Sequence, residues 1–267
     1  MRSVAALASA AAVALLGGCG VVRDMRSEYV ANRALRDASE ELLSSRPRFH
    51  RARADLDLAF RLRRDDPRFV ARLAEAYQGA GGFERAIECY EAQTKLTGEK
   101  RDSQIGFCLL KLGKAQAGAE RLERALRQAA ADLAGGRIGP AAYANTLNDA
   151  GYAFVDANVQ VDQAFELIAE AVRLRPLEPA YIDSLGWAYY RRGKYDDAAF
   201  HLERAARLLR RRDAEILWHL GAVHAQVGKL RRAEGELTEA LALEPANAAA
   251  RQTLRRMLRE LPPPATA

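Results

Sequence analysis

Residues 181–205 read YIDSLGWAYYRRGKYDDAAFHLERA, and they contain two runs of apolar side chains separated by a short polar break. Within each run the apolar positions recur at spacings of three and four, which places them on one face of an α-helix. Gly193 lies in the break, where a residue that accepts positive φ commonly ends a helix. Gly186 lies where the two helices are expected to touch closely. The stretch therefore predicts a hairpin of two helices, each of about a dozen residues.

The same pattern recurs along the chain at a nearly constant spacing. Leu220-Gly221 lies 35 residues after Leu185-Gly186, and Ala150-Gly151 lies 35 residues before it. Two further copies precede these, at Leu73-Ala74 and Ile105-Gly106. Five copies near one period, across residues 67–247, indicate an array of stacked hairpins rather than a chance motif.

The signature Ile-x-x-Leu-Gly-x-x-Tyr, followed by Ala-x-x-x-Leu, resembles the tetratricopeptide (TPR) repeat. The resemblance implies an all-α fold, a right-handed TPR solenoid of antiparallel helix hairpins. The period fails once, because Gly106 and Gly151 are 45 residues apart, about 11 more than one repeat of 34. The surplus contains three glycines and one proline, so residues 131–143 are predicted to be a loop insertion. It separates a first lobe, residues 67–130, from a second lobe, residues 144–247.

Residues 1–18 are predicted to be a lipoprotein signal peptide. A positive charge at Arg2 precedes an uncharged apolar run over residues 4–16, which is too short to cross a bilayer. The run ends Leu16-Gly17-Gly18-Cys19, which resembles the bacterial lipobox. Cys19 is therefore expected to be acylated and to become the mature N-terminus. The alternative is an ordinary signal peptide with an incidental cysteine. Gly20, in place of an aspartate, favours the outer membrane over the inner membrane.

The segments that flank the repeats are expected to cap the array. Residues 19–66 are interpreted as the lipidated N-terminus and a degenerate helix pair, because apolar residues recur at helical spacing in residues 23–43 and 53–62. Residues 248–267 are predicted to be a polar closing helix and a tail that begins at three consecutive prolines. A solenoid needs such caps at its open ends.

Composition and motifs argue against most kinds of chemistry. A net charge of +6 would fit a nucleic-acid partner, but export argues against one, and 35 of the 41 basic residues are arginine, which indicates a genome bias. The nine arginines of residues 46–72 form either a solvated face or a surface for anionic headgroups. The sequence contains no P-loop, dinucleotide fingerprint, H-E-x-x-H or G-x-S-x-G motif. We therefore expect no enzyme activity, no catalytic residue and no cofactor.

The histidines and cysteines do not form a recognisable metal site. His219 and His224 are five residues apart on one predicted helix, about 140° apart around its axis, so they are expected to diverge. Cys89 and Cys108 fall on helices that should be neighbours. They form either a disulfide, which the periplasm permits, or two buried thiols.

The candidate binding surface is the groove that first helices line in TPR folds. The resemblance implies that three positions of each first helix point inward: two before the Leu-Gly leucine, one after its glycine and four after it. The partner-binding candidates at these positions are Phe107, Asn148, Tyr152, Asp183, Trp187, Tyr190 and Trp218. Aromatic side chains beside polar ones are typical of protein-binding surfaces. The alternative is that neighbouring repeats, or another segment of the chain, bury these rings.

These features favour a lipid-anchored, non-enzymatic scaffold that binds protein or peptide partners at the periplasmic face of the outer membrane. Two roles of lipidated TPR proteins stay open. One is an adaptor that gathers envelope enzymes, and the other is a pilotin that helps an outer-membrane secretin or a polysaccharide or pilus export complex to assemble. A secreted hydrolase is disfavoured, because no nucleophile and base stand in a suitable pattern. The sequence leaves the oligomeric state open.

Overall fold

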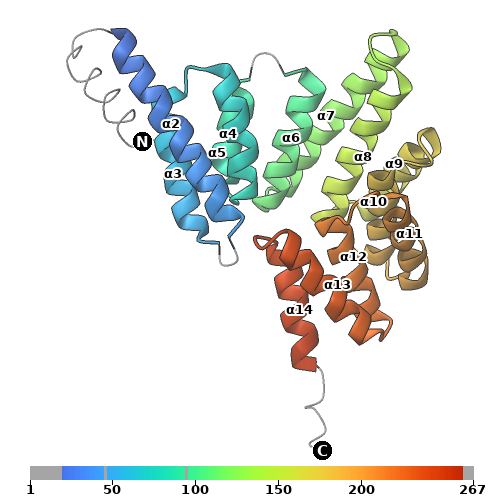
Figure 1. The fold of residues 1–267 in the computed structure, drawn as a ribbon. Coiled ribbons are helices and arrows are strands. Elements are labelled where there is room, and N and C mark those ends of the chain that lie inside the picture. Colours follow the sequence, from blue (N-terminus) through green and yellow to red (C-terminus); the bar gives the residue numbers. More distant parts are fainter. Residues whose placement is uncertain (1–19, 45–46, 94–95, 261–267) are drawn as a thin grey trace, which may run out of the picture. The chain divides into compact units, whose positions relative to one another are not determined.

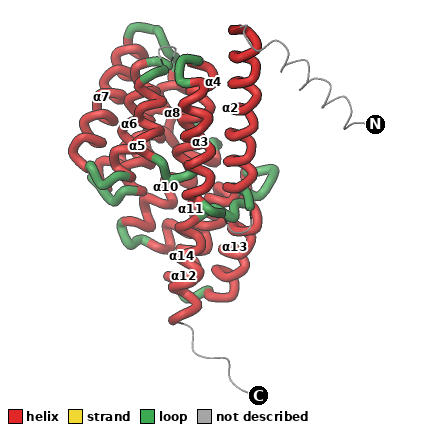
Figure 2. Tube along the Cα trace, turned by 90° about the vertical axis from the view of Figure 1, so that its left-hand side faces the viewer, coloured by secondary structure: helices red, strands yellow, loops and turns green. Residues whose placement is uncertain are grey.

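The computed structural model describes residues 20–44, 47–93 and 96–260, and these residues form thirteen α-helices and no strand (Figures 1 and 2). The predicted all-α class is confirmed. Residues 1–18, Cys19 and residues 261–267 lie outside the described part of the chain, and so do the signal peptide and lipidation site predicted there. No helix among the described residues combines the length and hydrophobicity of a membrane span. Contacts between residues divide the chain into two compact units, and the main boundary in sequence lies between residues 92 and 93.

The first unit contains α2 (Gly20–Leu42), α3 (Phe49–Arg63), α4 (Pro67–Gly79) and α5 (Phe83–Glu91). Helix α2 packs along α3, and both contact α4. A helix pair is therefore present before residue 67, and Ala52, Leu56 and Ala59 lie on the buried side of α3. Asp66 begins α4 by accepting hydrogen bonds from two backbone N–H groups of the first turn.

Arginines of residues 46–72 form ion pairs within the first unit. Arg48 donates to the two carboxylate oxygens of Glu41 at 3.0 and 2.8 Å, and these bonds lower the pKa of Glu41 to about 2. Arg63 bridges Asp24 and Asp66, at 2.8 Å to each. The free basic excess of this region is therefore smaller than the count of arginines suggests.

The second unit consists of four hairpins and a closing helix. The hairpins are α6 (Gly98–Lys111) with α7 (Ala115–Ala134), α8 (Pro140–Asp156) with α9 (Val161–Leu174), α10 (Pro179–Arg191) with α11 (Tyr195–Leu208), and α12 (Ala214–Gln226) with α13 (Leu230–Leu243). Helix α14 (Ala248–Glu260) packs on α12 and α13. The first helix of each hairpin also contacts the first helix of the next, as α8 contacts α10 and α10 contacts α12. This second set of contacts determines where the binding candidates lie.

Glycine lets the helices of a hairpin approach each other. A Cβ atom added at Gly186 would lie 2.6 Å from Cγ of Leu202 on the facing helix, well inside contact distance. The turn after α10 uses Gly193 at φ +74°, in the left-handed region that side chains disfavour. Both glycines therefore have the roles that the sequence pattern predicts.

The loop insertion predicted at residues 131–143 is wrong in extent. Helix α7 continues to Ala134 and α8 begins at Pro140, so only residues 135–139 connect them. The alanine-rich end of α7 favours helix, and Asp132 accepts hydrogen bonds from Gln128 and Arg137 that hold its last turn. The surplus residues lengthen these helices to 20 and 17 residues instead of forming a loop. The predicted division into lobes at this loop is not observed either, because the units meet at residues 92 and 93.

Cys89 in α5 and Cys108 in α6 are free, buried thiols. Buried thiols are one of the two states that the sequence allows. Burial raises the pKa of each thiol to about 12.

Candidate functional site

The residues that the sequence suggests for binding lie on first helices, but most of them are buried. Phe107 is on α6, Asn148 and Tyr152 are on α8, Asp183, Trp187 and Tyr190 are on α10, and Trp218 is on α12. Trp187 is 4% exposed and Trp218 is 9% exposed. The expectation that these tryptophans are accessible anchors is therefore wrong. The alternative, burial of the rings by neighbouring repeats, describes them correctly.

The tryptophans are buried because the first helices of neighbouring hairpins pack together. Trp187 stacks on Tyr190 with 4.5 Å between ring centroids, and on His219 of α12 with 4.2 Å. Trp218 of α12 lies 5.1 Å from Trp187. This aromatic cluster joins α10 to α12 and contributes to folding. Sequence spacing shows on which side of a helix a residue lies, but not how closely the next helix approaches that side.

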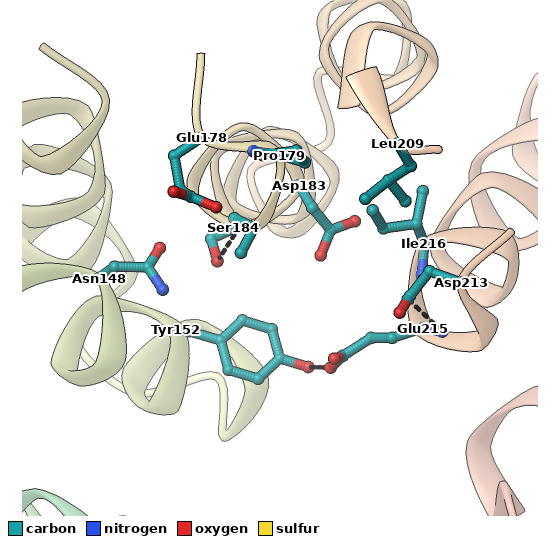
Figure 3. Close-up of a pocket in the computed structure, with 11 residues that line it drawn as sticks. Asn148, Tyr152, Glu178, Pro179, Asp183, Ser184, Leu209, Asp213, Glu215 and Ile216 are labelled. Carbon is teal, nitrogen blue, oxygen red and sulfur yellow. Dashed lines mark hydrogen bonds between the residues drawn. The ribbon is translucent and has the colours of Figure 1, made fainter. Parts of the chain in front are cut away.

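Three of the seven candidates line a common pocket, and four do not. The pocket has a volume of about 250 Å³ and is bordered by first helices of three successive hairpins, α8, α10 and α12 (Figure 3). Its lining consists of Asn148, Tyr152, Glu178, Pro179, Ala180, Asp183, Ser184, Leu209, Asp213, Glu215 and Ile216. Four of these residues carry carboxylates and none is basic, so we call it the acidic pocket. Phe107 lies elsewhere, with the ammonium of Lys111 5.4 Å from its ring centroid.

The acidic residues come largely from two helix starts. Glu178 immediately precedes α10, whose first turn contains Pro179. Asp213 caps α12 by accepting hydrogen bonds from the backbone N–H groups of Glu215 and Ile216 at 2.9 and 3.1 Å. Negative side chains are stabilised at such ends by the helix dipole. Because α10 and α12 begin successive hairpins, both starts border the same pocket.

Buried hydrogen bonds join the acidic pocket to the aromatic cluster. His219 is completely buried, and its Nδ1 lies 2.9 and 3.0 Å from the two carboxylate oxygens of Asp183. Burial opposes the charged imidazolium, but the Asp183 carboxylate outweighs burial and raises the pKa of His219. Tyr152 donates a hydrogen bond to Glu215. Burial, together with the nearby carboxylates of Asp183 and Asp213, raises the pKa of Glu215.

Asn148 presents an unused acceptor to the pocket. Its side chain is 8% exposed, and its Oδ1 has no hydrogen-bond partner among the described residues. Figure 3 shows the carboxamide pointing into the space that Glu178 and Tyr152 also border. Buried polar atoms are usually hydrogen-bonded, so this oxygen is suited to accept a bond from a ligand.

The sequence interpretation misses Glu178, Asp213, Glu215 and His219 as neighbours of the site. A signal was available, because Glu178 and Asp213 are 35 residues apart, the period of the repeats, and each precedes a predicted first helix. The divergence of the two histidines is confirmed, since His224 bonds Glu236 of α13 at 2.6 Å while His219 bonds Asp183 of α10.

Comparisons of sequence relate part of the chain to one repeat family. A sequence model described as tetratricopeptide repeat matches residues 179–211, which contain α10 and α11. A TPR repeat-containing protein of Pseudomonas aeruginosa is 44% identical over 78 residues, which is 29% of this chain. The match covers 13% of the Pseudomonas protein's own length.

Solved structures of the same repeat class share the fold. A tetratricopeptide repeat protein from Parabacteroides merdae superposes with a TM-score of 0.64 at 11% identity, over 93% of this chain and 89% of that one. A thermophilic TPR protein of Thermus thermophilus superposes with a TM-score of 0.55 at 20% identity, over 72% of this chain and 99% of that one. At these identities the likeness concerns architecture alone.

Proposed function

Because this chain is a tetratricopeptide-repeat protein, we propose that it is a non-enzymatic scaffold that holds a segment of a partner protein in the acidic pocket. One observation carries the proposal: first helices of three successive hairpins jointly border a single pocket, with a buried acceptor at Asn148 that has no partner among the described residues. Repeat arrays commonly bind their partners across several adjacent repeats. The tryptophans serve this pocket indirectly, by fixing α10 against α12.

Site-specific photo-crosslinking tests the proposal. Ala180 is exposed and lines the pocket, so p-benzoylphenylalanine fits there. Phe200 on α11 is 60% exposed, does not line the pocket and serves as the control position. In cells, the reagent at position 180 is expected to yield a discrete crosslinked protein that position 200 does not yield. Identical products from both positions, or none from position 180, would reject this pocket as the binding site.

We further propose that the scaffold is lipid-anchored at Cys19, at the periplasmic face of the outer membrane, where it acts as an adaptor. Support comes from the Leu16-Gly17-Gly18-Cys19 motif, the preceding apolar run and Gly20. Since α2 begins at Gly20, an anchor at Cys19 leaves the first unit near the bilayer surface. A single acyl chain gives marginal membrane binding, so stable anchoring requires more than one.

Lipidation is tested by metabolic labelling with palmitate and by membrane fractionation. Wild type is expected to incorporate label and to sediment with outer membranes, and Cys19→Ser is expected to do neither. If Cys19→Ser still takes up palmitate, the anchor lies elsewhere.

A further inference from the structure

We propose that the acidic pocket binds one positively charged side chain, arginine or lysine, presented by the partner segment. This inference rests on the proposed function and specifies the chemistry of the segment. Two kinds of observation carry it: the charge of the pocket walls, and the buried acceptor of Asn148 that faces the cavity.

The carboxylates that line the pocket outnumber the basic side chains that pair with them. Glu178, Asp183, Asp213 and Glu215 line it, and its lining includes no lysine, arginine or histidine. Two of the four have a partner outside the lining, since Glu178 forms an ion pair with Arg175 at 2.6 Å and Asp183 hydrogen-bonds His219 at 2.9 Å. Within the described part of the chain the other two carboxylates form no ion pair, since Asp213 accepts backbone N–H groups and Glu215 accepts the Tyr152 hydroxyl.

Capping explains only part of this arrangement. Asp213 accepts two backbone hydrogen bonds at the start of α12, so its position follows from the helix. Glu178 makes no side-chain cap bond to α10. Glu215 is in the first turn of α12 with two other carboxylates close enough to oppose its ionisation. A bound cation would stabilise the charged form of Glu215 and oppose the effects of burial and of the neighbouring carboxylates that raise its pKa.

The acceptors suit an ammonium or a guanidinium group. A lysine side chain offers three N–H donors and an arginine side chain offers five, and neither accepts hydrogen bonds. Oδ1 of Asn148 is an unpaired acceptor on α8, and carboxylates of α10 and α12 lie on other sides of the same cavity (Figure 3). A cation at this position could therefore donate hydrogen bonds to acceptors on three helices.

The size and the apolar walls fit a side chain rather than a larger molecule. Pockets for drug-sized ligands have volumes of roughly 300–1,000 Å³, and this pocket has about 250 Å³. Leu209 and Ile216 provide apolar surface for the methylene groups of a long side chain. The ring of Tyr152 also lines the cavity, where it can lie against a cation.

Calorimetric titration of the full-length chain in non-ionic detergent, at low ionic strength, tests the inference. The probes are capped pentapeptides with a central arginine, lysine or citrulline between alanines. Citrulline keeps the shape of arginine but removes its charge. We expect saturable binding of at least one basic peptide, and binding of the citrulline peptide at least tenfold weaker. The tighter basic peptide identifies a guanidinium or an ammonium site. Equal affinity for the citrulline peptide would overturn the proposal.

Variants assign the binding to the pocket. Glu215→Gln and Asn148→Ala are each expected to weaken the basic peptide about tenfold, and Glu178→Gln provides a second charge variant if Glu215→Gln does not fold. Glu239→Gln is the matched control. Glu239 lies on α13, is half-exposed, forms an ion pair with Arg212 and does not line the pocket. Circular dichroism melts verify folding. An equal loss of peptide binding in Glu239→Gln would mean that the peptide responds to the net charge of the chain, and it would overturn the assignment of binding to the pocket.

The two proposals fail in different ways. A partner crosslinked at position 180 without any preference for basic peptides would reject the cationic side chain and keep the scaffold. Binding of basic peptides without a crosslinked partner would reject the scaffold and keep the cation site.

Discussion

At Trp187 the indole is held between Tyr190 and His219 and is 4% exposed. Replacing a buried aromatic residue with alanine removes its contacts and leaves a cavity, which costs about 3–5 kcal/mol. Trp187→Ala is therefore expected to lower the free energy of unfolding by about that amount in urea titrations followed by circular dichroism. Phe200→Ala, at a residue that is 60% exposed, should change it by less than about 0.5 kcal/mol. Similar values for both variants would contradict the burial of Trp187.

The pair of His219 and Asp183 predicts a dependence of stability on pH. The folded-state pKa of His219 is raised above its ordinary 6.5, so the folded chain holds this proton more tightly than the unfolded chain does. The stabilisation is fully present below about pH 6.5 and is lost as pH rises through the raised pKa. Asp183→Asn removes the charge that causes the shift. The stability gap between wild type and Asp183→Asn should therefore be largest near pH 6 and shrink at higher pH.

Unfolding titrations from pH 6 to 9 measure this gap, with Glu239→Gln as a variant whose gap should stay constant. A gap for Asp183→Asn that widens with rising pH would mean that His219 is not protonated against Asp183.

The two buried cysteines should be inert in the folded chain. Their pKa values of about 12 leave almost no thiolate at pH 8, and the thiolate is the reactive form. In a Cys19→Ala background, the thiol reagent dithiobis(nitrobenzoate) is expected to label neither cysteine of the native chain within minutes. Both cysteines should be labelled after guanidinium unfolds the chain. Rapid labelling of the native chain would contradict the packing of α5 or α6 around its cysteine.

At the scale of helix pairs, substitutions at two glycines distinguish the effect of a close helix contact from the effect of helix propensity. A methyl group at Gly186 would lie 2.6 Å from Cγ of Leu202, whereas a methyl group at Gly235 on α13 would meet nothing within 4 Å. Gly186→Ala should destabilise by about 1–3 kcal/mol through overpacking. Gly235→Ala should stabilise by up to about 1 kcal/mol, because alanine favours helix more than glycine does. The melting temperatures should move in opposite directions, and a shared direction would refute the close hairpin contact.

Helix starts explain why the sequence interpretation identifies only three of the eleven residues that line the pocket. Asn148, Tyr152 and Asp183 could be predicted, because the resemblance to the TPR repeat implies that each of them occupies an inward position of a first helix. Glu178, Asp213 and Glu215 have an ordinary explanation as acidic residues at helix N-termini, so each looks structural when considered alone. These three residues border one pocket only because α10 and α12 pack side by side, and local periodicity does not specify that packing.

For the whole molecule, periodic features could be predicted and aperiodic ones could not. The hairpins, the close contact at Gly186 and the turn at Gly193 follow from a pattern that occurs five times along the chain. The extra residues that lengthen α7 and α8 have no such repeat. Their glycines predict a long loop, although alanines extend α7 to residue 134. The division at residues 92 and 93 depends on the number of contacts between hairpins, which the sequence pattern does not report.

Hydrogen–deuterium exchange of the full-length chain, with and without the partner captured at position 180, tests most directly whether the acidic pocket is the binding site. Binding there should slow exchange at the starts of α10 and α12, in residues 178–184 and 213–216, because the segment would cover both. Exchange in the second helices α9, α11 and α13 should change little. Protection confined to those second helices, with residues 178–184 and 213–216 unchanged, would contradict binding in the acidic pocket.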